Sequence, residues 1–133
     1  MRTVAAFLLF LTVSFGARAE DHANWYQVRD GKWEVPAAVV TDIYPLLQAS
    51  ADKAPPLHVL RPMSDFTVQY QGVVIDNNVR LVRLNGACAA MGRSPQALRD
   101  SWLIVFDGGT CYFQATYDPA TKRIVSFQFN AGA

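Results

Sequence analysis

The sequence predicts an α+β domain in which one N-terminal helix packs on a curved antiparallel sheet of about five strands. Over residues 36–54, apolar residues recur at three- and four-residue spacing, which is typical of a helix with one buried face. From residue 66 onward, apolar and polar residues alternate between short turns, which indicates half-buried strands. Because short turns join strands of opposite direction, the sheet is expected to be antiparallel.

The first nineteen residues have the pattern of a cleavable signal peptide. Arg2 supplies a positive start, residues 4–15 are mostly apolar, and Ala17-Arg18-Ala19 places small residues before a cut. A membrane-spanning helix needs about 20 apolar residues, so this run is too short. We therefore expect a signal peptide over 1–19 and a single mature domain over 20–133, periplasmic or secreted, with no membrane span in the mature form.

The charge balance excludes some classes of partner. The full chain has a formal net charge of +1, and removal of Arg2 and Arg18 with the signal peptide leaves −1. A near-neutral chain of mixed signs gives no electrostatic basis for binding nucleic acid or an anionic membrane surface. We expect no nucleic-acid partner.

The two cysteines, Cys88 and Cys111, both lie in the expected mature domain. In a small exported domain, an even number of cysteines predicts a disulfide. Their separation in the sequence is too long for a redox pair or a zinc knuckle. The bond is expected to tie the second predicted strand to the fourth.

The predicted helix starts at Pro36, which suits the first helical position, and Ala54-Pro55-Pro56 ends it. Its buried face includes Val39, Ile43 and Leu46 or Leu47. Pro45 lies inside this pattern and removes a backbone donor, so a kink or a break is expected there. Residues 57–64 are expected to form a loop.

The strand pattern follows this helix to the end of the chain. Ser94-Pro95 is a helix cap followed by a favourable first helical residue, so residues 95–100 are expected to form a short helix. Before the long helix, residues 25–35 contain Asp30-Gly31 and fit either a short hairpin or an extended arm over the core. The first expected strand begins near Phe66. The other four cover residues 79–87, 102–106, 111–117 and 124–130. Cystatin-like folds have this layout, and so do several other folds, so the layout names no activity.

The second half of the chain also resembles a group of small uncharacterised exported proteins of proteobacteria. The motifs that match are Tyr70-Gln71-Gly72, Asn85-Gly86-Ala87-Cys88, Trp102, Asp107-Gly108-Gly109-Thr110-Cys111-Tyr112-Phe113 and Tyr117-Asp118-Pro119. They span residues 66–133. No activity is established for that group, so the resemblance implies the disulfide and the topology and nothing about function.

Three aromatic residues near the mature N-terminus are candidate binding residues. Trp25, Tyr26 and Trp33 lie outside the strong periodic pattern. Trp and Tyr dominate binding hot spots, so these residues fit an exposed recognition patch. The alternative is an arm that covers the core.

A metal site is a second hypothesis. Cleavage after Ala19 would leave a chain that starts Glu20-Asp21-His22. A free amine, two backbone amides and a histidine in third position suit square-planar Cu(II) or Ni(II). Copper is the alternative to an expectation of no cofactor.

An enzyme is the least supported hypothesis. The two histidines, His22 and His58, lie in no known catalytic motif, and Asp30, Asp76, Asp107 and Asp118 suit turns. A hydrolase would have to use His58 with a carboxylate from a neighbouring loop. The sequence therefore favours a non-enzymatic, exported binding domain whose partner is another envelope or extracellular protein, acting as an inhibitor or an accessory factor.

Overall fold

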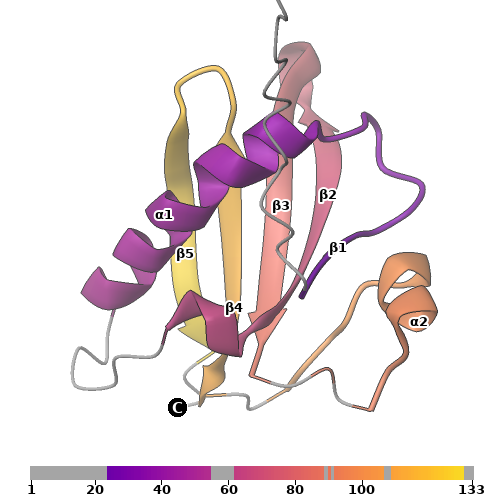
Figure 1. Ribbon diagram of the computed structural model, residues 1–133. Coiled ribbons are helices and arrows are strands. Elements are labelled where there is room, and N and C mark those ends of the chain that lie inside the picture. Colours follow the sequence, from indigo (N-terminus) through magenta and orange to yellow (C-terminus); the bar gives the residue numbers. More distant parts are fainter. Residues whose placement is uncertain (1–23, 55–61, 89, 91, 107–108, 131–133) are drawn as a thin grey trace, which may run out of the picture.

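The computed structural model describes residues 24–54, 62–88, 90, 92–106 and 109–130. It contains one long helix, one short helix and a five-stranded sheet, so the predicted α+β class is confirmed (Figure 1). In chain order the elements are β1 (Trp25–Gln27), α1 (Ala37–Lys53), the 3-10 turn η1 (Met63–Asp65), β2 (Thr67–Ile75), the 3-10 turn η2 (Asp76–Asn78), β3 (Val79–Ala87), α2 (Pro95–Asp100), β4 (Gly109–Asp118) and β5 (Arg123–Asn130).

The sheet is mixed, so the expected antiparallel arrangement is confirmed for β2, β3, β4 and β5 and does not hold for β1. The strand order is β1-β2-β3-β4-β5, with β1 parallel to β2 and the other neighbours antiparallel. β2, β3, β4 and β5 follow the turn-based reasoning. β1 differs because α1 lies between it and β2 in the chain, and a helical crossover permits parallel pairing.

Helix α1 lies across one face of the sheet (Figure 1). Its buried residues are Val40, Ile43, Leu47 and Ala51, and Val39 is only partly buried. They share one apolar cluster with sheet residues such as Val68, Leu84 and Phe113. The helix continues through Pro45, so the predicted kink or break does not interrupt it as an element.

The opposite face of the sheet, called the outer face below, is partly covered by the chain that follows α2. The sequence predicts a strand at 102–106, and this prediction is wrong, because residues 102–105 pair with no strand. Side-chain amides of the sheet form hydrogen bonds to this segment and to the residues just before it. Gln69 Nε2 donates to the carbonyl oxygens of Leu98 (2.6 Å) and Ser101 (2.8 Å), and the Leu103 N–H donates to Gln69 Oε1 (2.7 Å).

A second buried amide completes this attachment. Asn85 Nδ2 donates to the Leu103 carbonyl oxygen at 2.8 Å. The side chains of Gln69 and Asn85 are each 1% exposed. The N–H and the carbonyl oxygen of Leu103, the buried residue of the segment, are thus satisfied without a strand ladder, as buried backbone groups require. The predicted short helix is confirmed as α2, and Ser94 Oγ accepts from the Ala97 N–H.

The predicted Cys88–Cys111 disulfide is confirmed. It joins the residue that follows β3 to a residue of β4, with the Cα atoms 4.8 Å apart. The predicted second and fourth strands are therefore direct neighbours in the sheet.

Candidate functional site

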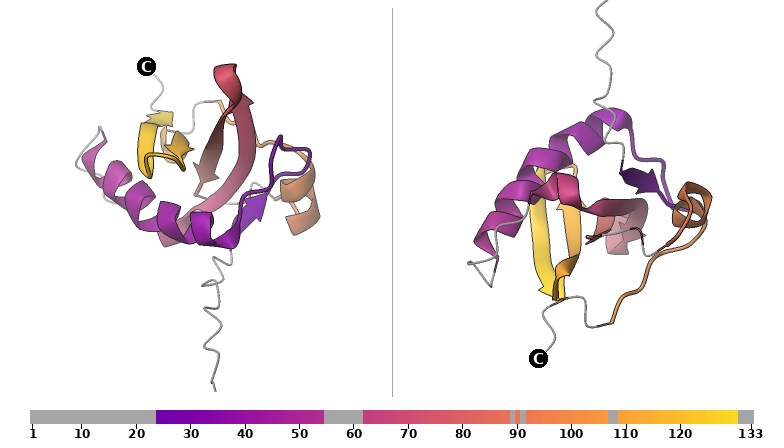
Figure 2. Two further views of the ribbon diagram at one scale, coloured as in Figure 1. Left: turned by 90° about the horizontal axis from the view of Figure 1, so that it is seen from above. Right: turned by 60° about the horizontal axis from the view of Figure 1, so that its bottom comes forward.

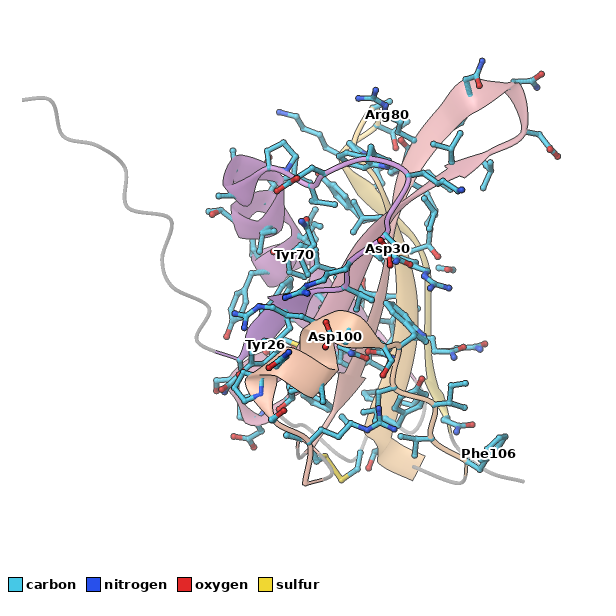
Figure 3. The ribbon with its side chains drawn as sticks, turned by 90° about the vertical axis from the view of Figure 1, so that its right-hand side faces the viewer. Tyr26, Asp30, Tyr70, Arg80, Asp100 and Phe106 are labelled. Atoms are coloured by element: carbon cyan, nitrogen blue, oxygen red, sulfur yellow. A yellow bond between two sulfur atoms is a disulfide. The ribbon has the colours of Figure 1, made fainter. Side chains whose placement is uncertain are left out.

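The β2–β3 hairpin extends past the rest of the sheet. β3 pairs with β4 only over Val82–Ala87, so residues 79–81 pair with β2 alone. Figure 3 shows this hairpin projecting from the body of the molecule. Among the described elements, none forms a layer over the side chains at the end of this projection.

Apolar side chains flank the turn of the hairpin on both strands. Ile75 is 51% exposed, and Val74 and Val79 are each 39% exposed. Ile75 and Val79 are cross-strand partners, and Val74 is opposite Arg80. These three apolar side chains form what we call the hairpin tip.

The turn that joins the strands is set by asparagine. Asn77 and Asn78 have φ values of 63° and 59°, in the left-handed region. Asparagine enters this region several times more readily than most residues other than glycine. The three-residue turn Asp76–Asn78 is therefore favoured by its own sequence, so the tip does not depend on a partner for its shape.

Trp33 supports the base of the hairpin. Its indole N–H lies 3.0 Å from the carbonyl oxygens of both Val73 and Leu81, which are cross-strand partners. The Arg80 guanidinium lies over the ring, 5.8 Å from its centre, a cation–π distance. Trp33 also forms a bridge with Gly72, where any Cβ atom would collide with the Trp33 carbonyl oxygen. One tryptophan thus links both strands of the hairpin at the point where they leave the sheet.

Residues 24–33 form an arm along β2, with a turn at residues 29–30, and not a hairpin. β1 pairs with β2, the Val28 N–H donates to the Tyr70 carbonyl oxygen, and the Lys32 N–H donates to the Gly72 carbonyl oxygen. Figure 2 shows β1 between α1 and α2 at this edge of the sheet. The arm is therefore the alternative that the structure selects.

The structure places Trp25, Tyr26 and Trp33 in three different environments, each partly buried. Trp25 packs at 5.9 Å from Tyr44 and 6.1 Å from Tyr70, measured between ring centres. Tyr26, the next residue, lies under the Arg99 guanidinium at 5.1 Å. Burial raises the pKa of Tyr70, with a smaller opposing effect from Arg99. Of the three predicted binding residues, Trp33 is the one whose side chain lies at the projecting part of the hairpin, against Val73 and Leu81.

The remaining sequence-based candidates lie outside the described residues. These are Glu20, Asp21 and His22, proposed for copper or nickel, and His58, proposed for hydrolysis. Among the described residues, no group of three or more His, Cys, Asp or Glu is arranged to hold a metal ion. In the same part of the chain, no helix has the length and hydropathy to cross a membrane.

The sequence reasoning missed the hairpin tip, although the sequence contains a signal for it. Up to residue 72, β2 follows an alternating pattern, and Val73-Val74-Ile75 then places apolar residues on both faces just before the turn. A strand can bury both faces only if another layer covers each of them. No element in the described part of the chain provides such layers at the tip, and Val74 and Ile75 are exposed.

Comparison of the chain with known protein families, with curated proteins and with solved structures finds no match.

Proposed function

We propose that this protein is an exported, non-enzymatic binding domain of the cell envelope that docks its β2–β3 hairpin into another protein. The observation that carries the proposal is the apolar tip, in which Ile75 is 51% exposed and Val74 and Val79 are each 39% exposed. Apolar surface in water costs free energy that burial against a partner recovers. Because the turn is set by its own residues, docking would cost little ordering entropy.

The chemistry of the hairpin defines the kind of partner. A projecting apolar element needs a concave apolar surface to receive it. Lys32 and Arg80 are exposed near its base, so an acidic rim around that surface would complement them. The turn itself is polar, with Asp76, Asn77 and Asn78 at the extremity. These groups would lose hydration in a lipid bilayer, so a protein cleft fits the hairpin better than a membrane does.

The cellular location is part of the proposal. The signal-peptide pattern of residues 1–19 supports export. The Cys88–Cys111 bond supports an oxidising compartment, because disulfides persist there. A helix followed by successive strands supports a cystatin-like layout, and the docking mode suits an accessory or inhibitor-like factor.

Site-specific photo-crosslinking in the producing cell tests this proposal. A photoreactive residue is placed at Ile75 in one variant and at Val125 in another. Val125 on β5 is 55% exposed and is a matched apolar control. We expect a discrete protein adduct from position 75 that is absent from position 125. Identical adducts from both positions, or none from position 75, would contradict docking through the hairpin.

A further inference from the structure

A polar groove lies on the outer face of the sheet, over β3, β4 and β5. Its volume is about 330 Å³, and its polar lining comprises Arg83, Trp102, Gln114, Thr116, Ser126 and Gln128. Leu84, Ala115 and Phe127 also border it, but Leu84 and Ala115 are buried in the apolar cluster on the helix side and Phe127 packs against that cluster. The other lining residues of the described chain offer a ligand amides, hydroxyls, a guanidinium and an indole.

Strand register arranges these groups in two rows across the sheet. In one row, Arg83 is opposite Thr116, and Thr116 is opposite Ser126. In the other, Gln114 is opposite Gln128. Adjacent strands are about 4.8 Å apart, so hydrogen-bonding groups repeat at that spacing along each row. Such an array suits a ligand with many regularly placed polar groups.

Arg83 is held in position from two sides. Its guanidinium carbon lies 4.1 Å from the centre of the Trp102 ring, and its Nε donates to Gln71 Oε1 at 3.0 Å. Trp102 is fixed in turn, because the next residue, Leu103, is bonded to Gln69 and Asn85. Among the described residues that line the groove, none is acidic. The outer nitrogens of Arg83 therefore face a described lining without a carboxylate, and guanidinium groups bind carboxylates in a bidentate manner.

The other polar side chains also have capacity to bind a ligand. Thr116, Ser126 and Gln128 make no side-chain hydrogen bond to any other described residue. Hydroxyl and amide groups both donate and accept, as do the hydroxyls of a sugar. A peptide would gain little here, because Phe127 packs against Phe113 in the helix-side cluster, which leaves Trp102 as the large apolar side chain that the described lining offers to the groove.

We propose that this groove binds a saccharide that bears a carboxylate group. Arg83 would bind the carboxylate, and Gln114, Thr116 and Gln128 would bind ring hydroxyls. This inference does not depend on the hairpin, because Arg83 and the hairpin residue Arg80 lie on opposite faces of β3.

Calorimetric titration of the purified protein tests the proposal. The ligands are trigalacturonate and, as the uncharged control, the galactose trimer. We expect saturable binding of the acidic trimer and weaker binding of the neutral one. Arg83→Gln should weaken binding of the acidic trimer roughly ten- to hundredfold, as for loss of a charge-assisted hydrogen bond. Binding of the neutral trimer should be unchanged. Arg80→Gln is the matched control and should change neither. Gln114→Ala should weaken binding of both trimers.

Further variants keep the test decisive if Arg83→Gln does not fold. Arg83→Lys retains the charge but loses the planar pair of donors, so binding of the acidic trimer should fall to an intermediate value. Ile75→Asp should bind both sugars normally, which separates this site from the hairpin. Absence of saturable sugar binding, equal effects of Arg83→Gln and Arg80→Gln, or equally tight binding of a triglutamate peptide would overturn the assignment.

Discussion

Two buried amide side chains determine how the outer face of the sheet is covered. Gln69 and Asn85, on neighbouring strands, make the hydrogen bonds that a further strand would otherwise make to residues 98–103. A buried backbone group without a partner costs free energy comparable to a lost hydrogen bond. These amides therefore fix the extended segment that holds Trp102 over Arg83.

The first prediction concerns Gln69. Gln69→Leu keeps a side chain of similar size but leaves the carbonyl oxygens of Leu98 and Ser101 and the Leu103 N–H without this partner. We expect the free energy of unfolding to fall by about 3 kcal/mol or more, since each buried unsatisfied group costs about 1–3 kcal/mol. Urea denaturation measures this. Gln128→Leu, at an exposed position, should change stability by no more than about 0.5 kcal/mol. Equal effects of the two substitutions would show that Gln69 is not structural.

The burial of Gln69 could not be predicted from its place in the strand pattern. It occupies a polar position between Val68 and Tyr70, which on sequence alone indicates a solvent-facing side chain. It is 1% exposed because the chain after α2 returns across this face. Local alternation contains no information about that long-range contact.

At the scale of the elements, the candidate site lies at the tip of the β2–β3 hairpin, and Trp33 supports the base of that hairpin. Most elements could be predicted, because α1, α2, β2, β3, β4 and β5 follow local periodicity and turn residues. The segment 102–106 has strand-like alternation, with Leu103 buried and Ile104 and Phe106 exposed. Figure 3 labels Phe106. The segment still forms no strand, because side-chain amides take the place of a neighbouring strand. β1 is three residues long, too short for periodicity to reveal its pairing.

The second prediction tests Trp33 as the support of the hairpin. Trp33→Phe keeps an aromatic ring but removes the N–H that lies 3.0 Å from the carbonyl oxygens of Val73 and Leu81. We expect a loss of about 1–2 kcal/mol in stability and faster amide hydrogen exchange over residues 73–81. Tyr26→Phe, on the same arm, is the control and should leave exchange in the hairpin unchanged. Unchanged amide hydrogen exchange over residues 73–81 in Trp33→Phe would show that Trp33 does not support the hairpin.

At the scale of the whole molecule, the disulfide closes a loop that contains α2 and the segment after it. Cys88 follows β3 and Cys111 lies in β4, so the bond restrains the ends of the chain that carries Trp102. The cysteine count and the fold class could be interpreted from the sequence. The apolar run Val73-Val74-Ile75 is visible in the sequence, but its exposure could not be predicted, because it depends on where β4 stops pairing with β3.

The third prediction concerns this bond. Cys88→Ser, Cys111→Ser and the double variant should each lower the free energy of unfolding by about 2–4 kcal/mol, because all three remove the same constraint on the unfolded chain. Chemical denaturation under non-reducing conditions measures the three values. A double variant that loses the sum of the two single losses would show that the cysteines act independently.

The central claim is that the hairpin tip docks into a partner protein, and the affinity of the crosslinked partner for two matched variants tests it most directly. Ile75→Asp places a charge at the tip, and Val125→Asp places the same charge at a similarly exposed apolar position on β5. We predict that Ile75→Asp weakens binding by about 2 kcal/mol or more, as at interface hot spots, with the unfolding midpoint unchanged. Val125→Asp should retain normal affinity. Unchanged affinity in Ile75→Asp, or equal losses in the two variants, would contradict docking through the hairpin.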